Sequence, residues 1–185
     1  MKASKTALAL ILTSSLCGAI VLPGCSTTPT SEDARANLKD DSNSALSDMK
    51  RTDSGLDNFL NNSVGYVIFP SVGKGAAGVG GAYGRGMVYE HGRFIGYADL
   101  SQGSIGVQLG GQTYSELIVF QNQDALDSFK NNKLQLEAAA SAVAMRAGAA
   151  SEAKFTNGIA IFTRPLGGLM FEAAIGGQQF TYTAQ

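Results

Sequence analysis

A glycine-rich stretch in the middle of the chain has a spacing that could bind phosphate. Residues 73–78 read Gly-Lys-Gly-Ala-Ala-Gly, which matches the G-x-G-x-x-G pattern of dinucleotide-binding loops. In those loops the last glycine begins a helix whose N-terminal amides bind the pyrophosphate. Residues 79–86 hold four further glycines, and each would destabilise a helix by about 1 kcal/mol. Nucleotide binding is therefore disfavoured, and no Gly-Lys-Ser/Thr sequence is present to form a Walker-type loop.

β-strands explain the same stretch better. Between residues 76 and 86 the even positions carry only glycine and alanine, whereas Val79, Tyr83 and Met87 stand at odd positions. Alternation with a period of two is typical of a strand, and glycine within a strand often marks a bulge, a bend or the close approach of another backbone. We expect a strongly curved sheet here. The alternative is that the stripe of small residues forms a groove for another molecule.

Residue types that carry catalysis are sparse. His91 is the only histidine and falls at a predicted turn, and the sequence has no G-x-S-x-G, H-E-x-x-H or C-x-x-C motif. Glu116 and Glu172 lie within apolar runs, where burial could raise the pKa of a carboxyl group, although exposed or paired carboxylates are the more ordinary interpretation. We therefore expect no enzymatic activity, no cofactor and no metal.

The N-terminus predicts an export signal over residues 1–24. Lys2 and Lys5 precede an interrupted apolar run that ends at Leu22, and this run is too short for a convincing membrane span. The signal ends in Leu-Pro-Gly-Cys, which resembles the lipobox of bacterial lipoproteins. This motif predicts that Cys25 carries a lipid.

Residues 25–31 would then be a lipidated polar tether. Ser26 after the cysteine resembles the pattern that permits sorting to the outer membrane. The alternative is ordinary cleavage, which would leave Cys25 as a free thiol. Without residues 1–24 the chain has 12 basic and 15 acidic residues, so its charge gives no indication of nucleic-acid binding.

The remaining residues, 32–185, suffice for a single domain that begins with two helices. Ser31 is a good N-cap because Glu32 and Asp33 follow it at the positive end of the helix dipole. Gly55 is expected to separate this helix from a shorter one that reaches Leu60. These helices would cover one face of a sheet or, alternatively, lie on a membrane.

Most of the chain after residue 64 predicts strands. Residues 90–93 form a hairpin turn with glycine at the position that needs a positive φ, and Asn122 caps a short helix that ends near Lys130. Residues 134–150 fit either a helix or a strand. The predicted strands are residues 65–69, 75–84, 86–89, 93–100, 104–110, 113–120, 159–163, 169–175 and 179–182.

Five segments carry a resemblance to a known family: Tyr66-Val67-Ile68-Phe69-Pro70, residues 73–86, residues 103–110, the helix expected over 124–129 and Gly167-Gly168-Leu169-Met170. Taken together, these motifs resemble the SYLF domain family. The resemblance extends from residue 34 to residue 182. It implies an α+β domain with a curved, mainly antiparallel, partly barrel-like sheet, N-terminal helices and a short helix after mid-chain, and it favours a strand after Leu134. It also implies a lipid-binding module without enzymatic activity.

The sequence thus predicts an exported lipoprotein on the periplasmic side of the outer membrane, whose domain binds membrane phospholipid. The alternative is a non-enzymatic structural or interaction protein of the envelope that docks another protein through its sheet. Phosphate groups bind cations, so basic residues are the candidates for contact with lipid headgroups. These candidates are Lys50, Arg51, Lys74, Arg85 and Arg93.

Overall fold

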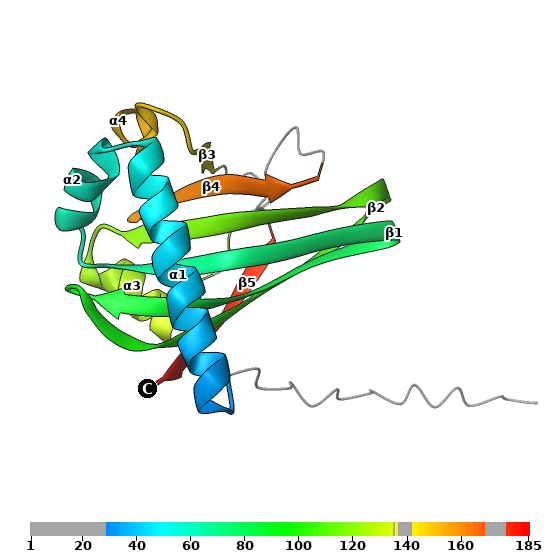
Figure 1. Cartoon of the computed structure of the whole chain (residues 1–185), viewed down its shortest axis with the longest axis horizontal. Helices are drawn as coiled ribbons and strands as arrows, with labels where there is room; N and C mark the ends of the chain where they lie inside the picture. The colour runs from blue at the N-terminus through cyan, green and yellow to red at the C-terminus, as the bar shows by residue number, and fades with distance from the viewer. Residues whose placement is uncertain (1–28, 135, 137–141, 169–176) are drawn as a thin grey trace, which may run out of the picture.

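One curved sheet with helices packed on it makes up the described part of the chain (Figure 1). The computed structural model describes residues 29–185 except 135, 137–141 and 169–176. The sheet is mostly antiparallel, as the sequence predicts, and within the described residues it does not close into a barrel. None of the described helices is long and apolar enough to cross a membrane.

The first N-terminal helix begins at its predicted cap, and Gly55 begins the second helix, as the sequence predicts. Ser31 caps α1 because its hydroxyl accepts a hydrogen bond from the Ala34 amide at 3.2 Å. Asp53 ends α1 and is buried, and its carboxylate accepts from the amide of Gly55 at 3.0 Å and from that of Ala150 at 2.6 Å. This one side chain therefore joins the start of α2 to α4. The bounds are Glu32–Thr52 for α1, Gly55–Asn61 for α2 and Ala149–Glu152 for α4.

A single long hairpin forms most of the sheet. Its strands are β1, Gly65–Glu90, and β2, Arg93–Phe120. His91 and Gly92 form the predicted turn with φ angles of 48° and 75°. The sequence predicted six separate strands between residues 65 and 120, whereas the structure joins them into these two long strands. The register of the two strands shifts in three places, between Phe69 and Val72, Ala77 and Val79, and Val88 and Tyr89, as at β-bulges.

β1 folds back so that its two halves lie against each other. The backbone amide of His91 donates to the Val64 carbonyl at 2.9 Å, and the rings of Tyr66 and Tyr89 stack with centroids 4.9 Å apart. A Cβ at Gly65 would lie 2.5 Å from the Tyr89 carbonyl oxygen. Only glycine fits at so close an approach of two backbones.

The stripe of small residues predicted in β1 faces the interior of the protein. Gly80, Ala82, Gly84 and Gly86 are buried, whereas Tyr83 between them is exposed. The side chains of residues 76–79 lie outside the description. The described part of the stripe therefore packs against the first half of β1 and leaves no open groove for a second molecule.

Three further strands and one helix complete the sheet and its cover. β4 pairs with the end of β2, β5 pairs with its beginning, and the short β3 lies parallel to β4. Asn122 caps α3 as predicted, since its side chain accepts from the Ala125 amide at 3.0 Å. Between Leu134 and Ala150 the described part forms β3 and the start of α4, and the strand predicted over residues 169–175 lies outside the described residues. The bounds are Gln123–Lys130 for α3, Val143–Ala144 for β3, Ile159–Gly167 for β4 and Gln178–Ala184 for β5.

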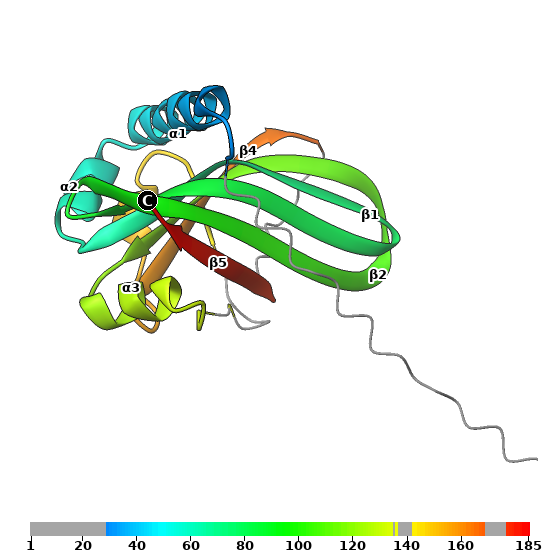
Figure 2. The same ribbon diagram turned by 90° about the horizontal axis from the view of Figure 1, so that it is seen from below.

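Both faces of the sheet are apolar, and a different helix covers each. α1 lies across one face and α3 packs on the other beside β5, as Figures 1 and 2 show. The core under α1 includes Met49 and Phe162, while the core on the α3 side includes Phe120 and Phe129. The predicted role of α1 as a cover for the sheet is confirmed.

The fold-back of β1 can be tested by replacing its glycines with alanine. A Cβ at Gly86 would lie 2.6 Å from the Ile68 carbonyl oxygen and 2.7 Å from the Phe69 ring, so we expect Gly86→Ala to lower the free energy of unfolding by about 2 kcal/mol in urea denaturation. Gly73→Ala on the same strand is the control, because no atom lies within 4 Å of its added Cβ. Equal stability of the two variants would contradict the close approach.

Candidate functional site

A polar hollow of about 440 Å³ opens between the C-terminal ends of α1 and α2 and the turn of the long hairpin. Lys50 lines it from α1, Asn61 from α2, Tyr66 from β1 and His91 from the turn. These four residues lie on four different elements, and the fold-back of β1 brings His91 close to the other three.

Three of the lining residues have interactions that bear on their role in the hollow. The ammonium group of Lys50 lies 2.7 Å from a carboxylate oxygen of Asp57 on α2. The left-handed backbone of His91 is held by its hydrogen bond to Val64. Burial raises the pKa of the Tyr66 hydroxyl to about 12, with Tyr89 adding to the shift, so Tyr66 remains a hydrogen-bond donor at neutral pH.

The structure does not gather the five predicted headgroup residues into one patch. Lys50 lines the hollow, and Arg93 is exposed and directly follows Gly92, which also lines it. Arg51 points elsewhere, because its guanidinium contacts Asp48 and donates to the Ser47 hydroxyl at 3.1 Å. The remaining two are on the sheet. Lys74 stands opposite Gln112 in β2, and Arg85 donates to the Tyr83 hydroxyl at 3.4 Å and lies 3.8 Å from Asp99.

Sequence reasoning missed Asn61 and Tyr66 as members of a site and treated His91 only as a turn residue. No local motif could have identified them, since the four lining residues lie on four separate segments. The one available signal was the chemistry of the turn, which predicted that residues 90–93 would present side chains at an exposed hairpin tip.

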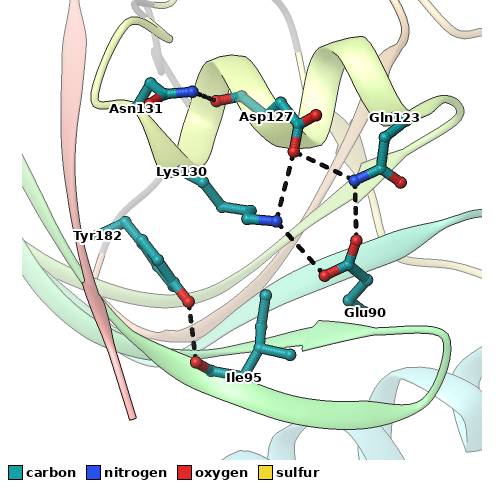
Figure 3. Close-up of polar contacts among 7 residues, drawn as sticks. All are labelled: Glu90, Ile95, Gln123, Asp127, Lys130, Asn131 and Tyr182. Atoms are coloured by element: carbon teal, nitrogen blue, oxygen red, sulfur yellow. Dashed lines mark hydrogen bonds and ion pairs between the residues drawn. The ribbon is translucent and has the colours of Figure 1, made fainter.

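A polar network anchors the hairpin behind this turn (Figure 3). The side-chain amide of Gln123 donates to Glu90 at 2.8 Å and to Asp127 at 3.1 Å. Lys130 of α3 lies 3.5 Å from the Glu90 carboxylate and 3.3 Å from that of Asp127. Glu90 immediately precedes His91, so α3 holds the base of the turn from the side opposite the hollow.

A second polar cluster is buried on the α3 side of the sheet. Glu116 and Gln178 are both fully buried, and the amide of Gln178 donates to Glu116 at 2.9 Å and to the Tyr114 hydroxyl at 3.3 Å. Burial raises the pKa of Glu116 to about 7, against the opposing effect of the hydrogen bond from Gln178. The sequence predicted that burial could raise this pKa. Glu172, the second candidate carboxylate, lies outside the described residues.

The chemistry available to these two clusters differs. The cluster of Glu116 holds a single carboxyl group, which accepts a hydrogen bond from an amide, and none of its residues lines the hollow. Within the described part of the chain, no group of three or more His, Cys, Asp or Glu side chains is placed to hold a metal ion. The hollow combines an ammonium group, an imidazole, a phenol and an amide, which suits recognition of an anion by charge and hydrogen bonds.

Comparison with known families gives one match. The model of the family Ysc84, described as "Las17-binding protein actin regulator", matches residues 101–183, from the middle of β2 to β5. This match confirms the resemblance to the SYLF domain family. No curated protein matches the chain.

The buried acid should make stability depend on pH. The pKa of Glu116 is about 7 in the folded state against 4.5 for an ordinary glutamate, so the folded state binds the proton more tightly. We expect the free energy of unfolding to fall by up to about 3 kcal/mol as the pH rises through the interval between these two values, and to lose no more above it. Urea denaturation at a series of pH values measures this change.

Glu116→Gln keeps the shape of the side chain without its charge and should remove this decrease. Glu32→Gln, a change at an exposed position at the start of α1, is the control and should keep it. A decrease of the same size in Glu116→Gln would assign the pH dependence to another group.

Proposed function

From the membership of residues 101–183 in the Ysc84 (SYLF) family, we propose that this chain is a non-enzymatic lipoprotein whose domain binds phospholipid. Its location would be the inner leaflet of the outer membrane, facing the periplasm. The hollow beside the hairpin turn is the observation that carries the proposal. Its donors suit the phosphate of a lipid headgroup, and no comparable set of catalytic groups lies in the described part of the chain.

The sequence at the end of the predicted signal supports the proposal of a lipid anchor. Leu22-Pro23-Gly24-Cys25 resembles a lipobox, and the polar residues up to Ser31 separate the cysteine from α1. Each methylene group of an acyl chain buried in a bilayer contributes about 0.8 kcal/mol, so a multiply acylated cysteine would hold the protein on the membrane by itself. Phospholipid binding by the domain would then serve to orient the domain or to recognise a lipid, and not to attach it.

The alternative is an envelope protein that docks another protein through its sheet. The described surface gives it less support. Tyr83 and Leu166 are the exposed large hydrophobic side chains among the described residues, with exposed fractions of 45% and 47%. Two of the strands at sheet edges are also short, since β5 has seven residues and β3 has two. The long β1 pairs only with β2, but its two halves lie against each other. A long exposed edge would suit docking better.

The description of the family names Las17 binding and actin regulation. We do not extend these properties to this chain. The proposed export signal would carry the domain out of the compartment in which actin is found. An envelope phospholipid is the ligand that agrees with both the signal and the hollow.

Flotation with liposomes tests the proposed lipid binding. The protein would be residues 26–185, which contain every residue of both cores, and the liposomes would contain increasing fractions of phosphatidylglycerol in phosphatidylcholine. We expect the domain to float with the liposomes at low salt, and to float less as salt screens the contact with phosphate. No flotation with any composition at low salt would refute phospholipid binding by the domain.

Replacement of Cys25 tests the anchor separately. We expect Cys25→Ala to move the full chain from the membrane fraction to the soluble periplasmic fraction, because the acylated thioether can no longer form. Cys17→Ala, a change within the predicted signal, is the matched control and should leave the protein on the membrane. Membrane retention of the Cys25 variant in a high-salt wash would contradict acylation.

A further inference from the structure

We infer that the hollow beside the hairpin turn is a phosphate-binding site, in which Lys50, Tyr66 and His91 contact the anion and Asp57 limits its affinity. The inference deepens the proposed function and rests on it, because phosphate is the part of a phospholipid headgroup that these residues would recognise. Free phosphate carries the same chemistry and is distinguished from lipid in the experiment below.

The lining of the hollow is rich in hydrogen-bond donors. Lys50 has an ammonium group, Asn61 a side-chain amide, Tyr66 a hydroxyl and His91 an imidazole. Ser63 also lines the hollow, but its hydroxyl already donates to the Leu60 carbonyl at 2.6 Å. A tetrahedral oxyanion accepts several hydrogen bonds at once, so a lining whose side chains carry four donor groups suits it better than it suits a cation.

The size of the hollow agrees with a phosphate that carries a further group. About 440 Å³ falls in the range of about 300–1,000 Å³ that is typical of small-molecule sites. A bare phosphate would leave part of this space to solvent. A headgroup diester would fill more of it, with the polar wall of the hollow around the phosphate.

Asp57 is the residue that makes this inference testable by a gain of binding. Its carboxylate lies 2.7 Å from the Lys50 ammonium, and the two side chains are 58% and 35% exposed. An exposed ion pair is weak, typically below about 1 kcal/mol, so an incoming phosphate can compete for Lys50. Without the Asp57 charge the ammonium group would no longer have a competing partner.

The experiment measures binding of inorganic phosphate and of phosphatidylglycerol vesicles to residues 26–185. Phosphate binding is followed by NMR of the amides near residues 61–66 and 90–93, and vesicle binding by flotation. We expect Asp57→Asn to bind both probes about fivefold more tightly, and Lys50→Gln to bind both about tenfold more weakly. Tyr66→Phe keeps the ring that stacks on Tyr89 and should weaken binding about threefold.

Matched controls separate the hollow from net charge. Asp41→Asn and Lys39→Gln make the same charge changes on the exposed surface of α1, away from the hollow, and should each stay within about twofold of the unmodified domain. A gain of affinity in Asp57→Asn cannot result from misfolding, so the test holds even where Lys50→Gln unfolds the domain.

The outcomes separate the site from the proposed function. If the binding of both phosphate and vesicles changes in the hollow variants and not in their controls, the result supports both the site and phospholipid binding. Binding of inorganic phosphate that follows these variants, without binding of vesicles, supports the site and identifies free phosphate as its ligand, while it overturns phospholipid binding. Vesicle binding that is equal in the hollow variants and their controls overturns the site and leaves lipid binding standing. Binding of neither probe overturns both.

Discussion

The close approach of the two halves of β1 is the constraint on which the rest of the structure depends. Gly65 lies against the Tyr89 carbonyl and Gly86 against that of Ile68, and a side chain at either position would push the halves apart. The separation would break the Tyr66–Tyr89 stack and the hydrogen bond between Val64 and His91. Because the turn forms one wall of the hollow, two glycines that touch no ligand determine the geometry of the candidate site.

The fold-back also explains why the sheet needs cover on both faces. A strand that bends through its own middle gives a sheet curved enough to enclose one apolar core, and its outer face carries another. α3 and β5 close the first core, while α1 and α2 close the second. The buried Glu116 lies on the enclosed side, where exclusion of water raises its pKa. One bent hairpin therefore accounts for both cores and for the buried acid.

The parts of the fold that sequence could predict are those decided within a few residues. Caps at Ser31 and Asn122 and the turn at Gly92 depend on backbone groups no more than four positions away, and each formed as predicted. The continuity of β1 depends on contacts between residues about twenty positions apart, and the glycines within this strand resemble the glycines of turns. The hollow was unpredictable for a related reason. Lys50, Tyr66 and His91 meet only after the fold-back, and no pattern of spacing links them.

The position of the hollow bears on how a tethered domain would use it. Lys50 stands eighteen residues after Glu32 in α1, so the hollow is about 27 Å along the helix from the end that the tether enters. An acyl anchor would hold the domain at a high local concentration of headgroups, and under that condition a weak site is occupied without high intrinsic affinity. The competition of Asp57 for Lys50 is compatible with such a role. It keeps the phosphate contact weak enough to be reversible. Under the proposed acylation, the anchor would attach the protein to the membrane, and the contact at the hollow would orient the domain relative to the membrane surface.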